Sequence, residues 1–282
     1  MIENVSDTAR WVAVYRAMET ERPDAHFRDP WARRLAGERG EAIMRSMPRG
    51  RQMSWPMVVR TQVFDEIILD AVRNRGVDLV LNLAAGLDVR AWRLELPPEL
   101  RWVDVDLPGI VEYKSGVMRD ETPRCRYQAI AADLADADAR AEVLARVAGG
   151  SRQALVVTEG LLVYLADADV DGLAAALHAQ PPLRWWLTDL ASPGLMKWMQ
   201  KRWGKQVSDG NAPFRFAPAA GAGFFARHGW REAEWRSTLE DAHRLRREMP
   251  MAWLWRFLGR LSTPARREEF RRFSGTLLLE RA

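Results

Sequence analysis

Between Val77 and Ala191, short apolar runs alternate with amphipathic segments, and this alternation limits the possible folds more than any other feature of the sequence. The first run, VDLVLNLA, is almost wholly apolar, as is typical of strands buried on both faces of a parallel sheet. The pattern predicts strands over 77–84, 101–107, 125–134, 154–158 and 183–191, with helices over 111–120, 137–148 and 167–179. Such an alternation indicates an α/β fold with a doubly wound, mostly parallel sheet.

The segments on either side of this core are predicted to be mostly helical. Before it, helices are expected over 11–18, 31–35 and 57–72, separated by prolines. After it, a helical insertion comes first, and two candidate closing strands follow over 229–238 and 275–281. A Trp-rich helical segment over 239–257 lies between these two strands. No repeat or low-complexity linker interrupts the chain, so the sequence predicts a single domain over residues 1–282.

The composition is that of an ordinary globular protein, with 48% hydrophobic and 28% charged residues. The formal net charge is +4, and 38 of the 42 basic residues are arginine. The densest basic runs, RLRREMP and ARREEF, also contain acidic residues. A nucleic-acid-binding surface requires clustered basic residues with interleaved aromatics, so no nucleic-acid partner is expected.

Cysteine content and hydropathy limit the kinds of site and the cellular location that the sequence allows. The single cysteine, Cys125, excludes an internal disulfide and a Cys-rich metal site, and no metal site is expected. No apolar run approaches the roughly 18 residues that a membrane-spanning helix needs, so no membrane partner is expected. The N-terminal stretch MIENVSDTARWVAVY lacks the basic-then-apolar pattern of a secretory signal. A cytoplasmic location is therefore expected, and the sequence does not indicate an oligomeric state.

A glycine turn follows the first predicted strand. Gly86 lies at the edge where parallel α/β sheets bind ligands, and a residue without a side chain lets the backbone approach a ligand closely. Asp106 stands 20 residues later, the spacing at which an acid accepts hydrogen bonds from ribose hydroxyls. Ala84 and Ala85 occupy positions where a dinucleotide fingerprint would have glycines. The pattern favours a nucleoside without phosphates over a dinucleotide, with a plain structural turn as the alternative.

Three other acidic residues are candidates at strand ends. Asp104 is a rival for Asp106 because strand alternation points both to the same side, but Asp106 is nearer the strand end. Asp133 follows the third strand, where it could accept from an adenine amino group or act as a helix N-cap. Glu159 follows the fourth strand, and a carboxylate there is costly to bury unless it meets a cation. The ammonium group of an amino acid would serve.

Several segments in a fixed order resemble a known family. VLNLAAGLDVRAWRL, WVDVDLP, AADL and TEGLLVYL resemble the leucine carboxyl methyltransferase family, and more closely its bacterial small-molecule and polyketide O-methyltransferase branch. The upstream RDPWARRL and the downstream FFARHGWREAEWRS are similar to that branch too, so the resemblance covers most of the chain. It implies a Rossmann-like methyltransferase sheet and S-adenosyl-L-methionine as cofactor.

The resemblance implies a role for each strand-end residue. Gly86 would approach the cofactor, and Asp106 would hold its ribose. Asp133 with Leu134 would frame the adenine, and Glu159 would lie near the methionine ammonium.

Two arginines are candidates for the cofactor carboxylate. The family has a basic residue at this position on the helix before the first strand, and Arg60 in VVRTQVFDE matches it. Arg16 in VYRAMETE is a second candidate, and a solvated helix arginine is the alternative for Arg60.

In this interpretation, residues 1–75 form an N-terminal helical cap, 76–192 a cofactor-binding core, and 193–282 a helical substrate cap with the closing strands.

The acceptor is expected to be a small molecule that is methylated on oxygen. A carboxylate is already ionised at neutral pH, whereas a phenol usually needs a base. No histidine stands at a predicted strand end, which favours a carboxylate. No catalytic residue is assigned, and the candidates for substrate positioning are Tyr164, Asp189, His228 and His243, each with a structural role as the alternative.

Tryptophans are concentrated late in the chain, with eight of the 13 after residue 180. They include Trp198, Trp203, Trp253 and Trp255. They form either the core of the helical additions or an aromatic wall for a flat or apolar acceptor.

The sequence therefore predicts an S-adenosyl-L-methionine-dependent O-methyltransferase that acts on a carboxylate or hydroxyl of a polyketide-like secondary metabolite. One alternative is a non-catalytic relative that binds cofactor or protein. A nicotinamide-dependent reductase is another, but the missing glycines and the absence of a Tyr-x-x-x-Lys pair argue against it. A nucleic-acid methyltransferase would require a contiguous basic patch.

Overall fold

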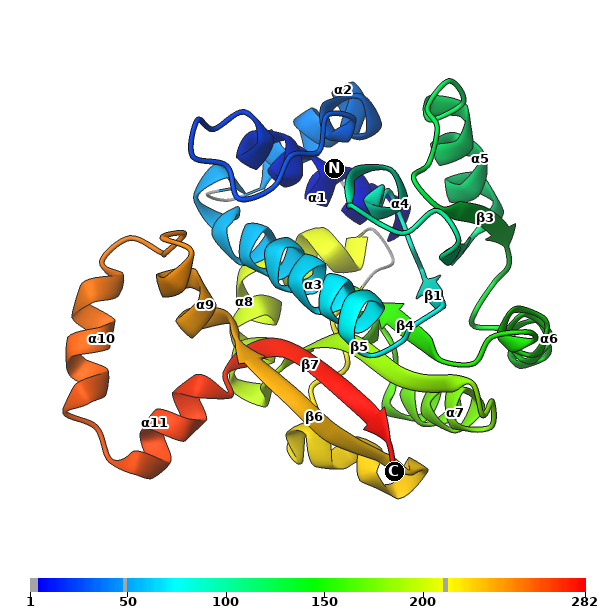
Figure 1. Ribbon diagram of the computed structural model, residues 1–282. Coiled ribbons are helices and arrows are strands. Elements are labelled where there is room, and N and C mark those ends of the chain that lie inside the picture. Colours follow the sequence, from blue (N-terminus) through cyan, green and yellow to red (C-terminus); the bar gives the residue numbers. More distant parts are fainter. Residues whose placement is uncertain (1–4, 48–49, 210–212) are drawn as a thin grey trace.

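The computed structural model describes residues 5–47, 50–209 and 213–282, and these build a seven-stranded sheet with helices on both faces (Figure 1). The strands lie in the order β3-β2-β1-β4-β5-β7-β6. Their bounds are β1 (Leu79–Leu83), β2 (Arg101–Asp106), β3 (Arg126–Ala131), β4 (Ala154–Thr158), β5 (Leu183–Ala191), β6 (Trp230–Ser237) and β7 (Ser274–Arg281). β1 to β5 are parallel, and β7 runs antiparallel to both β5 and β6. All seven predicted strands and the doubly wound fold class are confirmed.

The central strand β1 shows why the sheet forms from such apolar runs. Its side chains alternate between two cores: Val80 packs on the face covered by α3, whereas Leu79 and Leu81 pack on the face covered by α6 and α7. Every residue of β1 is buried. Because both faces are covered, a strand with polar residues on one side would leave unpaired groups in a core.

Most predicted helices are present. The helical elements are α1 (Val5–Thr20), α2 (Ala32–Ser46), η1 (Gly50–Met53), α3 (Trp55–Asn74), α4 (Arg90–Arg93), α5 (Pro108–Val117), α6 (Ala137–Ala148), η2 (Leu162–Tyr164), α7 (Asp167–His178), α8 (Pro193–Asp209), η3 (Gly221–His228), α9 (Thr238–Arg244), α10 (Ala252–Arg260) and α11 (Pro264–Arg271). None of the described helices is both long and apolar enough to span a membrane.

The helix predicted over 31–35 is longer in the structure. α2 continues to Ser46 through Gly37, which has a positive φ of 61° and kinks the helix. At Gly40 an added Cβ would lie 2.9 Å from the carbonyl oxygen of Arg10, so this glycine allows α1 and α2 to pack closely. Tertiary packing therefore outweighs the helix cost of glycine, about 1 kcal/mol.

The helical segment predicted over 239–257 is divided in two in the structure. The chain forms α9, then a turn, then α10, and α11 follows where no helix was expected. Arg246 and Met251 have positive φ values of 50° and 62°, and Pro250 disfavours a helical conformation at Met249. As a result α10 and α11 extend away from the body beside α9 (Figure 1).

Candidate functional site

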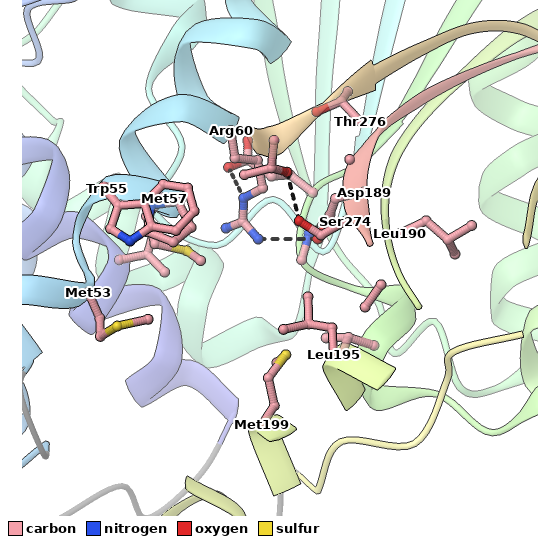
Figure 2. Close-up of a pocket in the computed structure, with 18 of the residues that line it drawn as sticks. Met53, Trp55, Met57, Arg60, Asp189, Leu190, Leu195, Met199, Ser274 and Thr276 are labelled. Carbon is pink, nitrogen blue, oxygen red and sulfur yellow. Dashed lines mark hydrogen bonds and ion pairs between the residues drawn. The ribbon is translucent and has the colours of Figure 1, made fainter. Parts of the chain in front are cut away.

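A cavity of about 1290 Å³ lies at the carboxyl ends of β1, β2, β4 and β5. One part is lined by polar residues from the loops that follow these strands. The other part is mostly apolar and is bounded by α1, α3 and the segments from α8 to α11. Figure 2 shows the second part, where Met53, Trp55 and Met57 face Leu195 and Met199 across the space next to the polar groups.

Gly86 and Asp106 meet at the polar end of the cavity. The loop after β1 gives Gly86 a positive φ of 53°, and its backbone N–H donates to Asp106 Oδ2 at 2.6 Å. The N–H of Leu107 donates to Asp106 Oδ1 at 2.7 Å. Burial raises the pKa of the Asp106 carboxyl, and the two backbone hydrogen bonds partly oppose that rise. Each carboxylate oxygen accepts one bond, so each retains a lone pair for a ligand hydroxyl.

Asp104 has a different environment. Its carboxylate is buried and accepts from Lys114 Nζ at 2.6 Å, from the Tyr127 hydroxyl at 2.9 Å and from Asn82 Nδ2 at 3.1 Å. Asp106 lines the cavity, whereas Asp104 does not. The side chain of Asp104 therefore connects β2 to its neighbours, and the geometry favours Asp106 as the ligand contact.

A network of buried charges lies between the polar and apolar parts of the cavity. Arg60 donates to Glu159 Oε1 at 3.0 Å. It also donates to Asp189 Oδ2 at 3.3 Å (Figure 2). The backbone N–H of Gly160 donates to the other oxygen of Asp189 at 2.6 Å. Gly160 has a positive φ of 67°, and an added Cβ would lie 3.1 Å from Arg60 Nη1, so a glycine lets the guanidinium approach the loop. The structure thus brings Arg60, Glu159 and Asp189 together.

Arg90, at the start of α4, is the centre of this network, although the sequence does not predict it as a site residue. It is 2% exposed and donates to Asp65 at 2.6 Å, and to Asp88 and Glu159 at 2.7 Å each. Burial alone would raise the pKa of Glu159, but the charges of Arg90 and Arg60 outweigh burial and lower it. The one signal in the sequence is Asp65, an acid among the apolar positions of the helix 57–72.

Arg16 and Tyr164 also line the cavity. Arg16 donates to Asp29 Oδ2 at 2.8 Å and to the carbonyl oxygen of Leu87 at 2.6 Å, which fixes its guanidinium beside the glycine turn. Tyr164 stacks on Phe214 with ring centroids 5.7 Å apart. Burial raises the pKa of the Tyr164 phenol, so at neutral pH it is a hydrogen-bond donor rather than an anion.

A model of the leucine carboxyl methyltransferase family matches residues 9–178, which include β1 to β4 and all the strand-end groups above except Asp189. The chain belongs to this family. A protein of Streptomyces avermitilis named as an S-adenosyl-L-methionine-dependent methyltransferase is 34% identical over 93% of this chain and 91% of its own length. A similarly named protein of Streptomyces coelicolor is 33% identical over 79% of this chain and 82% of its own length. This chain is therefore an S-adenosyl-L-methionine-dependent methyltransferase.

Solved structures agree on the fold of the methyltransferase. A DUF574-family protein from Streptomyces avermitilis superposes with a TM-score of 0.63 at 15% identity, over 98% of this chain and 97% of that protein. A protein from Thermobifida fusca, described as a methyltransferase, gives a TM-score of 0.62 at 14% identity, over 99% and 95%. At this level of identity the likeness concerns the Rossmann-like fold alone.

Two residues that the sequence places at the adenine lie outside the cavity lining. Asp133 is exposed, and its side chain accepts from the N–H of Ala135 at 2.9 Å, which is a local turn contact. Leu134 packs against the core on the α6 and α7 face. The structure does not bring these two residues to the methyltransferase cavity, so their assignment stays a prediction from sequence.

The two candidate histidines also lie away from the cavity lining. His228 Nε2 lies 2.8 Å from Asp171 Oδ1, between η3 and α7. The side chain of His243 is 60% exposed and lies 3.4 Å from Glu248. Because neither histidine lines the cavity, the expectation that one of them caps the substrate is not supported by the geometry.

The expected aromatic wall is present in part. Trp11, Trp55 and Trp198 line the cavity, whereas Trp253 is exposed on the outside of α10. The side chains of Trp203 and Trp255 lie outside the described residues. Of the tryptophans whose side chains are described and line the cavity, two come from the N-terminal helices α1 and α3 and one comes from α8.

Proposed function

We propose that the methyltransferase transfers the methyl group of S-adenosyl-L-methionine to a carboxylate or hydroxyl oxygen of a small, polyketide-like molecule. The observation that carries this proposal is the single cavity with two chemically different parts. Its polar part presents Gly86 and Asp106, and its apolar part is lined by thioether, aromatic and aliphatic side chains such as Met53, Trp55 and Leu195. Cofactor and acceptor would thus share one space.

The residues at the polar end fit an adenosine. Gly86 offers backbone without a side chain, and the free lone pairs of Asp106 suit two ribose hydroxyls. When bound, the cofactor supplies a methyl group activated by its sulfonium. The residues of this chain would bind the cofactor and the acceptor, orient them and exclude water. Such positioning can lower a reaction barrier by about 7–11 kcal/mol.

The charged network suits the amino-acid end of the cofactor. Its connected side chains are three arginines and four acids, with a formal charge of −1: Arg60, Arg90, Arg93, Asp65, Asp88, Glu159 and Asp189. The cofactor carries +1 in total, so the charges complement each other. Arg60 and Arg16 would bind its carboxylate and Glu159 its ammonium, although Arg60 and Glu159 also bond each other.

We propose a carboxylate as the acceptor group in preference to a phenol. Among the described residues, no histidine lines the cavity. A carboxylate needs no base at neutral pH, whereas a phenol does. Tyr164 and Asp189 stand where the two parts of the cavity meet, and we propose that they position the acceptor.

Three consecutive segments of the chain contribute different walls of the cavity. We propose that residues 1–75 cap the site, that 76–192 hold the cofactor, and that 193–282 supply the acceptor wall. The cytoplasmic location and the single-domain organisation remain predictions from sequence.

Product chemistry tests the proposal. The protein is incubated with cofactor bearing a deuterated methyl group and with a panel of aromatic carboxylic acids and matched phenols. A methyl ester releases labelled methanol in mild base, whereas a methyl ether does not, so mass spectrometry separates the two outcomes. Transfer to nitrogen, sulfur or carbon in place of oxygen would refute O-methylation. Cofactor binding without transfer to any acceptor would favour the non-catalytic relative.

A further inference from the structure

The segment 251–272, which contains α10 and α11 and is called the α10–α11 arm here, concentrates exposed apolar side chains. Among the described side chains, seven large hydrophobic ones are exposed, and five of these belong to the arm: Met251, Trp253, Phe257, Leu261 and Phe270. The arm extends from the body next to α9, at the opposite end of the molecule from α6 (Figure 1). A cluster of this kind marks an interaction site.

Among the described side chains of α10, the exposed apolar ones do not line the cavity. Ala252, Arg256 and Gly259 line the cavity, and Arg256 forms an ion pair with Glu248 there. The stripe on the outer side consists of Trp253, Phe257 and Leu261, spaced four residues apart and between 56% and 73% exposed. A soluble helix normally turns its apolar stripe to the core. The outer stripe of α10 therefore lacks its partner in this structure.

The arm also carries the net charge of the chain. It contains six arginines and two glutamates, a formal charge of +4, so the rest of the chain balances 36 basic against 36 acidic residues. The side chains of Arg266 and Arg267 are exposed in the first turn of α11 and, among the described residues, have no hydrogen-bond or ion-pair partner. Cations are unfavourable at that end of a helix, so local stability does not explain them.

We propose that the α10–α11 arm binds the surface of an anionic lipid membrane. An amphipathic helix with Trp, Phe and Leu on one face and arginines nearby is the pattern that lies in the plane of a lipid interface, and each basic residue adds attraction to anionic headgroups. A second copy of the chain is the weaker candidate, because a two-fold contact would set one +4 arm against another.

This proposal goes beyond the methyltransferase activity. No membrane partner is expected from the sequence because it contains no apolar run long enough to span a membrane, and binding through a helix that lies on the membrane surface is a separate property. Since the inner face of α10 lines the cavity, docking would place the apolar acceptor wall next to the lipid phase.

Vesicle co-sedimentation of the full chain tests the inference. We expect the protein to bind vesicles of phosphatidylglycerol and phosphatidylcholine but not vesicles of phosphatidylcholine alone. Binding should weaken when salt is raised from about 0.05 M to about 0.5 M, because screening shortens the reach of the charges. Replacing the stripe by Trp253→Ser, Phe257→Ser and Leu261→Ser together should weaken vesicle binding at least tenfold. This variant should keep its affinity for the cofactor, measured by calorimetry, since none of the three residues lines the cavity.

A matched pair of charge variants separates the arm from net charge. Arg267→Glu and Arg146→Glu change the total charge equally, and both arginines are exposed, but Arg146 lies on α6. Vesicle binding should fall severalfold for Arg267→Glu and stay unchanged for Arg146→Glu. Equal losses in this pair would overturn the proposal, as would a wild-type protein that ignores anionic vesicles or a stripe variant that binds them normally. A dimer in light scattering that the stripe variant converts to monomer, without vesicle binding, would assign the stripe to a second copy instead.

Discussion

Replacing Arg90 by methionine is the sharpest test of the charged network beneath the cavity. Methionine keeps an unbranched apolar stem in the buried position but removes the guanidinium. Asp65, Asp88 and Glu159 would each lose a donor that now lies 2.6 to 2.7 Å away. The three carboxylates are largely enclosed, so water cannot fully replace the lost charge.

The size of the effect follows from this geometry. Removing one partner of a buried ion pair costs about 3–5 kcal/mol, because it leaves an uncompensated charge in the interior. Arg93 still pairs with Asp65, and Arg60 still pairs with Glu159, which argues for the lower part of that range. We therefore expect Arg90→Met to lower the free energy of unfolding by about 3 kcal/mol at neutral pH.

The loss should also depend on pH. The pKa of Glu159 is lowered in the folded protein, so its ionised form stabilises the fold above the ordinary value of 4.5, and this stability is lost as pH falls through the folded pKa. Without Arg90 the pKa of Glu159 would rise and that stability would be missing. The difference between wild type and variant should therefore shrink as the solution is acidified.

Urea denaturation of the ligand-free protein, followed by circular dichroism, measures both effects. The control is Arg152→Met, because the Arg152 side chain is 88% exposed and its ion pair with Asp78 spans 3.5 Å. Substitutions at such exposed positions usually stay within about 0.5 kcal/mol. A loss below about 1 kcal/mol for Arg90→Met, or a loss that does not change with pH, would refute the view that Arg90 holds three buried carboxylates.

Three further predictions concern the site. Burial raises the pKa of Asp106 above 3.8, so cofactor affinity should weaken on acidification at a higher pH than an ordinary aspartate allows. In calorimetric titrations, Asp106→Asn should flatten the pH dependence of cofactor affinity, and Asp106→Ala should weaken cofactor binding at least about tenfold. The control Asp120→Ala, at an exposed position, should change neither the affinity nor its pH dependence. Ala84 adopts a positive φ of 52°, which costs a non-glycine residue about 1–2 kcal/mol. Ala84→Gly should therefore raise the free energy of unfolding by up to about 1 kcal/mol after the added chain entropy of glycine, and a lower stability would contradict that conformation. His228→Ala and His243→Ala should each retain methyl transfer in the labelled-product assay, and an inactive variant with normal cofactor affinity would overturn the preference for a carboxylate.

How much the sequence could predict varies with the range of the interactions. Gly86, Asp106 and Glu159 follow apolar strands at the edge where parallel sheets bind ligands, so a local pattern places them near one another. Arg90 could not be found in this way, because its partners Asp65, Asp88 and Glu159 come from three separate segments. Asp104 and Asp106 also could not be separated firmly from sequence, since the difference lies in Lys114 and Tyr127, which reach Asp104 from other elements.

The C-terminal segment shows the same limit. The segments 229–238 and 275–281 predict β6 and β7, but the helical segment predicted over 239–257 contains Pro250 and a turn that divides it into α9 and α10. Which side of α10 faces the cavity depends on how the arm leaves the sheet, and no local pattern encodes that direction.

The sequence alone determined the order of strands and helices along the chain, because backbone hydrogen bonding and burial on two faces leave few arrangements for alternating apolar and amphipathic segments. It also determined which acids end the strands. The tertiary structure alone decided which of those acids face open space, which are neutralised by buried arginines, and that an apolar stripe on α10 is left uncovered. These are contacts between distant segments, and their energies depend on burial and on distances that exist only once the chain has folded.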